Sequence, residues 1–271
     1  VGGTITLSDG GGSVNIDDTD PTNELQNLSV SATGDTLYLS NGNGVVIPGI
    51  SFANSPAALY CPGSVFCSSG PAAVVDVFNP VTGKTWMDRN LGASQLATSS
   101  TDAAAYGDLY QWGRFTDGHQ CRTSNEQNNA FSATDTPGHP DFITVNPLTN
   151  PNDWRSPQNN NLWQGMNCAD NNPCPTGYRL PTISEWQGEL LSWIGGDPAN
   201  SVLNLTLGGR RSVLGGNQIA IVGVSGRYWS STTVFDGGEA SRYISVGPTT
   251  GSISFTNSFR GFGLSVRCIK D

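Results

Sequence analysis

The apolar side chains of one stretch recur with the period of a helix. They fall on one stripe at spacings of three and four residues: Ile183, Trp186, Leu190 and Ile194. Thr182 precedes this stripe and Glu185 follows three residues later, which is the arrangement of a capping box. Pro181 cannot continue a helix from upstream, and two glycines, Gly195 and Gly196, end the run. The pattern predicts a helix that begins after Thr182 and buries one face.

Most other ordered stretches alternate apolar and polar positions with the period of a strand. The predicted strands are Val75–Phe78, Lys84–Met87, Arg227–Ser231, Ser241–Val246, Ser252–Phe255 and Leu264–Ile269. The first two form a predicted hairpin that turns at Asn79–Gly83. A short helix is predicted over Ala103–Ala105, opened by Asp102. The predicted fold class is therefore α+β, rich in loops and in short antiparallel strands.

The pattern also divides the chain into three predicted parts. Residues 1–50 hold no cysteine and one aromatic residue, Tyr38, and their short alternating pieces are separated by Asp, Asn and Gly turns. Because so few large apolar groups cannot form a core alone, we expect this β-rich segment to pack against copies of itself or against the next domain. Residues 51–73 contain three prolines and form a predicted linker. The predicted globular domain spans residues 74–271.

Composition narrows the function classes. The net charge is -9 and the sequence has no Lys/Arg run, which argues against nucleic acid as a partner. No apolar run is long enough to span a bilayer. Charged residues make up only 13% and glycine is abundant, as in exported, loop-rich β proteins. Val1 is neither a start Met nor part of a signal peptide, so we expect a mature or excised piece.

Cysteine spacing predicts disulfides. The six cysteines include two pairs with the same spacing, Cys61 with Cys67 and Cys168 with Cys174. Zinc ligands usually stand closer together, and His119 and His139 lie elsewhere, so local disulfides are preferred to a zinc site. Cys121 would then pair with Cys268 by elimination. Three disulfides indicate an oxidising compartment, at the cell or virion surface or outside the cell.

An acidic cluster in the first part is a candidate cation site. Its oxygen-bearing residues are Asp17, Asp18, Asp20, Asn23 and Glu24. Such oxygens suit calcium, so calcium is a possible ligand although no cofactor is required; a solvated polar turn is the preferred interpretation. The stretch around them resembles the shafts of phage tail fibres and surface fibres. That resemblance implies a homo-oligomer, with a trimer favoured and a filament as the alternative.

Five blocks of the domain, in this order, resemble the Fibrobacter succinogenes major paralogous domain (FISUMP) family. The blocks are Gly83–Gly92, Tyr106–Arg114, Gly177–Trp186, Tyr228–Thr232 and Ser265–Cys268. This family is similar to proteins with the C-type-lectin-like fold, among them formylglycine-generating enzymes and the variable proteins of diversity-generating retroelements. The resemblance implies a C-type-lectin-like domain over residues 74–271.

The variable proteins use the residues between the last two blocks as a receptor-binding face. By that resemblance, the candidate contact residues are Thr233, Phe235, Asp236, Glu239, Arg242, Tyr243, Asn257, Phe259 and Arg260. Aromatic residues and Arg are enriched at binding hot spots. The alternative is that Phe235 and Phe259 only cap the sheet.

Catalysis is not expected. Formylglycine-generating enzymes use cysteine thiols late in the chain, whereas this chain offers only Cys268 there. The sugar-chelating tripeptides of calcium-dependent lectins are also absent. The sequence thus favours an extracellular adhesion protein at a fibre tip that binds a cell-surface glycan or protein receptor. The alternatives are a subunit of an extracellular filament or surface layer and, least favoured, an enzyme.

Overall fold

The computed structural model divides the chain into two compact units, Val1–Ser55 and Pro56–Asp271. In the first unit it describes the backbone of five strands only. In the second it describes residues 56–128, 131–145, 152–193, 201–214, 216, 218–234, 240–248 and 252–271. The acidic cluster, with Asp17, Asp18, Asp20, Asn23 and Glu24, lies outside the described residues.

The five strands of the first unit form two small antiparallel sheets. One pairs β1 (Gly3–Thr6) with β2 (Ser13–Ile16). The other has the order β3-β4-β5, built from Leu28–Val30, Thr36–Leu39 and Val45–Val46. The β-rich character predicted for this segment is thus confirmed.

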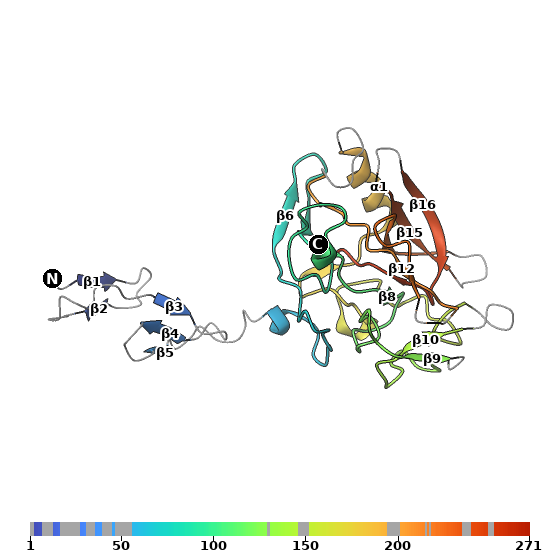
Figure 1. The fold of residues 1–271 in the computed structure, drawn as a ribbon, viewed down its shortest axis with the longest axis horizontal. Helices are drawn as coiled ribbons and strands as arrows, with labels where there is room; N and C mark the ends of the chain where they lie inside the picture. The colour runs from blue at the N-terminus through green and yellow to red at the C-terminus, as the bar shows by residue number, and fades with distance from the viewer. Residues whose placement is uncertain are drawn as a thin grey trace. The chain divides into compact units, whose positions relative to one another are not determined.

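The second unit contains one α-helix and many short strands among its described residues, which agrees with the predicted mixed class (Figure 1). Its 3₁₀ turns are η2 (Pro56–Leu59), η3 (Ala103–Ala105) and η4 (Cys168–Asp170). A four-stranded sheet of order β11-β18-β7-β6 contains Tyr178–Arg179, Ile269–Lys270, Lys84–Met87 and Asp76–Asn79. A second, of order β13-β12-β17-β8, contains Ile219–Ala220, Arg210–Arg211, Gly263–Leu264 and Tyr110–Gln111.

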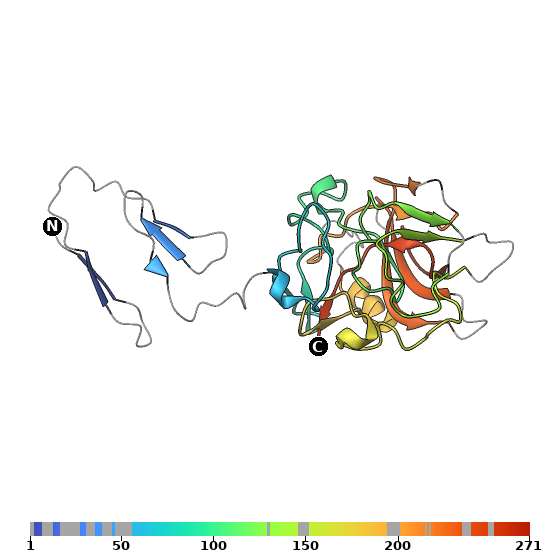
Figure 2. The same ribbon diagram turned by 90° about the horizontal axis from the view of Figure 1, so that it is seen from below.

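The longest strands form a third sheet of order β14-β15-β16, built from Gly226–Thr233, Ala240–Val246 and Ile253–Phe259. The short strands β9 (Glu126–Asn128) and β10 (Phe142–Thr144) run parallel and lie side by side in both views (Figures 1 and 2). Neither strand is among those that the sequence predicts.

The helix α1 (Ile183–Leu191) begins where the sequence predicts. Thr182 Oγ1 accepts a hydrogen bond from the Glu185 N–H at 3.2 Å, and Glu185 Oε2 accepts one from the Thr182 N–H at 2.8 Å. The capping box is therefore present. Trp186 is fully buried, and Ile183 and Leu190 pack beside it against the same core.

The core consists of two hydrophobic clusters, separated by the sheet β14-β15-β16. Neighbouring residues of β14 belong to different clusters, because successive side chains of a strand point to opposite faces. Tyr228 packs with Trp86 and Trp186 in the cluster under α1. Trp229 packs with Tyr243 in the other cluster, where their rings meet edge to face at 6.1 Å. The sheet is thus buried on both faces where β14 lies.

The predicted last strand, Leu264–Ile269, is wrong as a single strand. Leu264 is the last residue of β17 and Ile269 is the first residue of β18. The residues between them are buried but do not form a strand. Backbone carbonyl groups of this stretch accept hydrogen bonds from three other parts of the chain. Ser265 O accepts from the Trp229 N–H, Val266 O from the Leu91 N–H, and Cys268 O from the Met87 N–H. The alternation of side chains reflects burial on all sides rather than one exposed and one buried face.

The six cysteines are all in disulfides, as predicted, but the three predicted pairs are wrong. The structure joins Cys61–Cys168, Cys67–Cys121 and Cys174–Cys268 in place of Cys61–Cys67, Cys168–Cys174 and Cys121–Cys268. Each bond spans at least 54 residues of sequence. The fold places the Cα atoms of each observed pair 5.5 to 5.9 Å apart, within the range a disulfide needs. Residues 56–73, predicted as part of a linker, are therefore bonded into the second unit.

Candidate binding face

The predicted contact residues are distributed over places of different kinds. Phe235, Asp236 and Glu239 lie outside the described residues. Thr233 and Arg242 are half-buried, and Asn257 is exposed. The remaining three are Tyr243, Phe259 and Arg260.

Arg260 is not a contact residue, and its prediction as one is wrong. Its side chain is 1% exposed and lies over the Trp112 ring at 4.2 Å. Its Nε donates to Ser241 Oγ at 3.0 Å, and its Nη2 donates to Asn160 Oδ1. The guanidinium joins the end of β16 to a neighbouring loop, because a buried cation needs its hydrogen bonds met inside the protein.

The register of the sheet separates the other candidates. Residues directly opposite one another on antiparallel strands share a face. Arg242 is opposite Asn257, and both lie on the α1 side of the sheet with the buried Ile244. Tyr243 is opposite Thr256 and lies on the other side. The structure thus does not bring the predicted residues into one surface.

Two glycines, one just before β12 and one at the start of β14, lie beside each other on the backbone. Gly209 and Gly226 form a parallel bridge. A Cβ on Gly226 would lie 2.1 Å from Thr206 O, and one on Gly209 would lie 2.5 Å from Ala220 O, so no side chain fits at either position. Because each glycine is followed by an arginine, the bridge places Arg210 and Arg227 near each other.

Each of these arginines lies over an aromatic ring. The Arg227 guanidinium is 5.5 Å from the centre of the Tyr243 ring, and that of Arg210 is 4.8 Å from the Phe262 ring. The Phe262 ring stacks on Phe259 at 6.5 Å. Phe259 is opposite Ala240, so it lies on the same side of the sheet as Arg242. We call the four residues Arg210, Arg227, Tyr243 and Phe262 the arginine–aromatic face. It combines residues of β12, β14 and β15, among them the buried Tyr243, with one residue of the loop after β16.

The two guanidinium groups are available for an outside partner. Neither forms an ion pair with the described residues, and Arg227 Nε is buried without a hydrogen-bond partner there. Burial lowers the pKa of Arg227, the Tyr243 phenol raises it, and the neighbouring Arg210 lowers it. The Arg227 guanidinium remains charged at neutral pH, because arginine loses its proton only in strong base. Two adjacent, uncompensated cations in a protein of net charge -9 form a local site for an anionic group.

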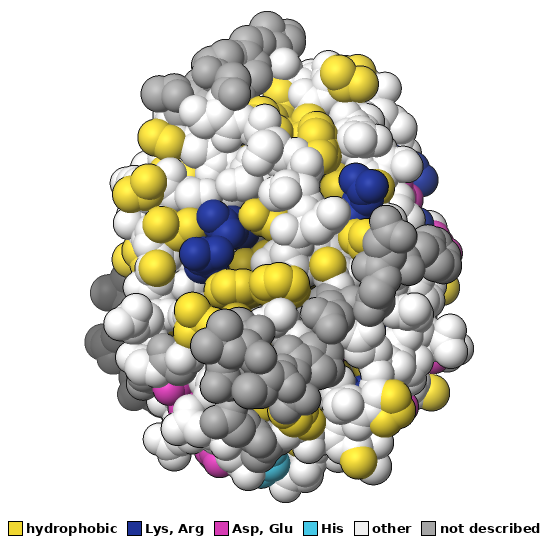
Figure 3. Space-filling model, turned by 90° about the vertical axis from the view of Figure 1, so that its right-hand side faces the viewer, with side chains coloured by type: hydrophobic (Ala, Val, Ile, Leu, Met, Phe, Trp, Pro, Cys, Tyr) yellow, Lys and Arg dark blue, Asp and Glu magenta, His cyan; other side chains and the backbone are white. Residues whose placement is uncertain are grey.

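Figure 3 shows the side of the molecule toward which β16, β9 and β10 lie in Figure 1. One group of Lys and Arg side chains there lies directly beside a strip of hydrophobic side chains, with no acidic side chain next to it (Figure 3). Phe255 and Phe259 of β16 are 38% and 41% exposed, respectively. A ligand on such a surface would meet apolar and cationic groups together.

Sequence reasoning missed Arg210, Arg227 and Phe262. The two arginines stand in identical Gly-Arg dipeptides, Gly209-Arg210 and Gly226-Arg227, and this repetition is the signal that could have found them. Such dipeptides are common, so the repetition alone does not predict a site. The Gly209–Gly226 bridge in the structure is what places the two arginines near each other.

His119 has a structural role in the second unit. It is fully buried; its Nε2 accepts from the Gln111 N–H at 3.0 Å, and its Nδ1 lies 2.7 Å from Asp117 Oδ1. Burial lowers the pKa of His119 to about 4, and the nearby Arg114 lowers it too, while Asp117 raises it. The imidazole is therefore neutral at pH 7 and is occupied on both nitrogens.

Among the described residues, no group of three or more His, Cys, Asp or Glu side chains is placed to hold a metal ion. No helix within the same ranges has the length and apolarity that crossing a bilayer requires. Calcium at the acidic cluster of the first unit stays a prediction.

Comparisons with protein-family models, with curated proteins and with solved structures find no match to this chain. The resemblance to the FISUMP family and the C-type-lectin-like fold therefore remain predictions.

Proposed function

We propose that the protein is an extracellular binding protein whose C-type-lectin-like second unit recognises an anionic glycan through the arginine–aromatic face. The observation that supports this most directly is the pair Arg210 and Arg227, adjacent, each over a ring, and unpaired with any described carboxylate. Three disulfides are consistent with a secreted protein.

The chemistry of this face suits a sugar that carries carboxylate or sulfate groups. A guanidinium binds such groups through two parallel N–H donors. The half-buried Phe262 offers apolar surface beside the cations, against which the C–H face of a sugar ring packs.

Glycan-array binding of the full chain tests the proposal. Sulfated or uronate-containing glycans are expected to bind, and neutral glycans of the same length are not. Arg227→Ala should weaken binding by about tenfold or more, because it removes a charge-assisted contact at the centre of the face. Raising the salt concentration should weaken binding of the native chain.

Arg242→Ala is the matched control, since Arg242 is also a half-buried arginine of the same sheet but lies on its other side. It makes the same change of charge and should leave binding near the native level. Equal loss in both variants would show a general charge effect, and binding of neutral glycans alone would contradict the proposal. A receptor captured through Arg227 with no anionic glycan bound would indicate an acidic protein instead.

Assembly is the function proposed for the first unit. As far as the described residues show, the sheet β1-β2 has two strands, each with one edge unpaired. An isolated pair of strands is marginal in water, so strands from other copies would complete it. Sedimentation of the full chain decides the form: a discrete trimer supports a fibre tip, and growth without limit as concentration rises supports the filament alternative.

A further inference from the structure

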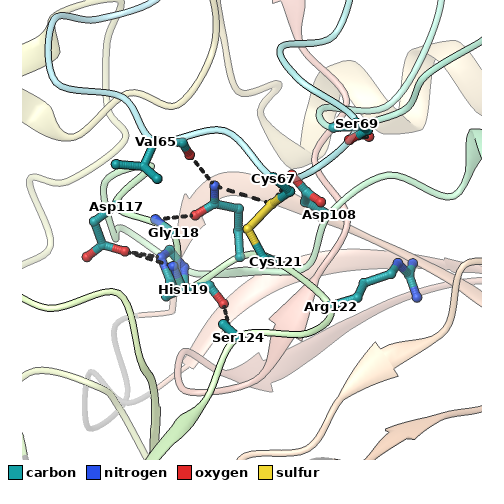
Figure 4. Close-up of a disulfide and its surroundings, with 12 residues drawn as sticks. Val65, Cys67, Ser69, Asp108, Asp117, Gly118, His119, Cys121, Arg122 and Ser124 are labelled. Atoms are coloured by element: carbon teal, nitrogen blue, oxygen red, sulfur yellow. Dashed lines mark hydrogen bonds and ion pairs between the residues drawn. A yellow bond between two sulfur atoms is a disulfide. The ribbon is translucent and has the colours of Figure 1, made fainter.

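The Cys67–Cys121 disulfide lies in a surface pocket and touches a buried carboxyl group (Figure 4). The pocket has a volume of about 210 Å³, and both cysteines line it together with Arg122 and Thr123. Cys67 and Cys121 are half-buried, whereas Cys174 and Cys268 of another disulfide are 1% and 0% exposed. A reagent in solution can thus reach the first bond and not the second.

Asp108 supplies the carboxyl group. Its Oδ2 lies 3.1 Å from Cys67 Sγ, and its side chain is 6% exposed. A disulfide sulfur carries no hydrogen, so this contact is a hydrogen bond only when the carboxyl group holds the proton and donates it. Burial raises the pKa of Asp108 to about 7, against a smaller lowering by Arg122. Near neutral pH, a proton is therefore held against the sulfur in a large share of molecules.

The surroundings maintain this contact. A Cβ on Gly92 would lie 2.2 Å from Asp108 Oδ2, so the glycine leaves the space that the carboxyl group occupies. Arg122 is directed to backbone oxygens, with Nε 2.7 Å from Gly107 O and Nη2 2.9 Å from Gly208 O. It does not form an ion pair with Asp108 among the described residues, which would have held the carboxyl group ionised.

From this geometry we propose that Cys67–Cys121 is a thiol–disulfide exchange site, opened by a dithiol reductant with Asp108 as the proton donor to Cys67. A thiolate of the reductant attacks Cys121 Sγ and forms a mixed disulfide. The Cys67–Cys121 bond breaks, its electron pair goes to Cys67 Sγ, and this sulfur takes the proton from Asp108. The second thiol of the reductant, as its thiolate, then attacks the reductant sulfur of the mixed disulfide and expels Cys121 as a thiolate. Cys121 and the Asp108 carboxylate each take a proton from the solvent, which received the two protons of the reductant. The reductant ends as a disulfide, and the protein ends with two thiols.

The charged and titratable groups that face Asp108 are Arg122, Tyr60 and Tyr110. The pKa values of both phenols are raised, mainly by burial, so they stay neutral over the range in which Asp108 titrates. The pH dependence of exchange near neutrality thus belongs to Asp108. Below its pKa the carboxyl group donates; above it, the carboxylate repels the leaving thiolate.

The test is the rate at which dithiothreitol opens each disulfide of the folded full chain, followed by alkylation and mass spectrometry. Rates are divided by the concentration of reductant thiolate at each pH. We expect Cys67–Cys121 to open about tenfold or more ahead of Cys174–Cys268. Its corrected rate should fall severalfold as pH rises through about 7, whereas Asp108→Asn should give a flat profile.

Thr123→Ala is the control, because Thr123 lines the same pocket and is exposed. It should retain the native profile. A flat native profile would overturn the proposal, and so would opening of Cys174–Cys268 before Cys67–Cys121. If Asp108→Asn does not fold, the native profile and the order of opening decide the matter alone.

Discussion

At the scale of single residues, buried polar side chains stabilise the second unit by donating hydrogen bonds to backbone oxygens. Arg114 donates to the backbone oxygens of His139 and Asp141, and Arg267 donates to those of Met87 and Leu203. Loops have few regular backbone partners, so side chains take over the bonds that strands would provide. This explains how a loop-rich unit keeps its arginines inside.

The first prediction concerns Arg267→Lys. The buried guanidinium bonds Asn90 Oδ1 through Nε and Nη2 at 3.1 and 2.9 Å, and Leu203 O through Nη1 at 2.7 Å. Lysine keeps the charge but offers donors at one point only, so it cannot span these acceptors. We expect a loss of about 3 kcal/mol in the free energy of unfolding, measured by urea titration. Arg242→Lys, at a half-buried site, should change it by less than about 0.5 kcal/mol.

The second prediction concerns His119 and acid. Its pKa is lowered to about 4 in the folded protein, so between about pH 6.5 and 4 the unfolded chain binds more protons. Stability contributed by the neutral imidazole is therefore present above pH 6.5 and is lost as pH falls through this window, by up to about 3 kcal/mol.

The difference between native protein and His119→Gln isolates this effect. Asp108 acts in the opposite sense, because its raised pKa favours the folded state as pH falls below about 7, but it is common to both proteins. Urea titrations across the window should show the native protein losing its advantage over the variant toward acid pH. A constant difference would mean that the folded imidazole is already protonated.

At the scale of elements, α1 depends on its cap. Glu185 reaches back to the Thr182 N–H and also receives two hydrogen bonds from the Arg179 guanidinium, at 2.8 and 2.9 Å. One carboxylate thus fixes the first turn of the helix and the strand β11 that precedes it. This double use ties the start of α1 to the four-stranded sheet.

The third prediction is Thr182→Ala. It removes the hydroxyl that accepts from the Glu185 N–H, and the expected loss is about 1 kcal/mol in the free energy of unfolding. Ser184→Ala is the control, because Ser184 lies in the first turn of α1, is exposed, and is not the capping residue. Thermal unfolding of both variants gives the comparison. Equal transitions would show that packing of Trp186 alone sets where the helix begins.

At the scale of the whole molecule, the disulfides tie distant segments of the second unit to one another. Cys174–Cys268 attaches the last strand, and the other two bonds attach the segment of residues 56–73. A cross-link over a long loop stabilises chiefly by restricting the unfolded chain. The unit therefore does not rely on long sheets for its stability.

The fourth prediction has two parts. A non-reducing peptide map should contain Cys61–Cys168, Cys67–Cys121 and Cys174–Cys268 as the cross-linked pairs. Replacing Cys174 and Cys268 together by Ala should remove about 4 to 5 kcal/mol of stability, the size expected for a loop of 94 residues. Recovery of a peptide that links Cys61 to Cys67 would contradict the fold at this point.

Local pattern accounts for the elements that were predicted correctly. The cap at Thr182, the short turn opened by Asp102 and the hairpin at Asn79–Gly83 each depend on residues within a few positions of one another. The predicted strand over Ser241–Val246 also matches β15. Hydrogen bonding and turn preference act over such distances, so the sequence carries them directly.

The sequence by itself determined the helix, its cap, the strands β6, β7, β14 and β15, and the oxidised state of the cysteines. Only the tertiary structure decided which cysteines meet, that Arg260 is buried, and that Arg210 and Arg227 lie together. These outcomes depend on segments far apart in the chain, and a spacing of residues in sequence says nothing of which distant backbone they pack against. The Gly209–Gly226 bridge is an example, because a Cβ on Gly226 would collide with Thr206 O of the segment that it meets.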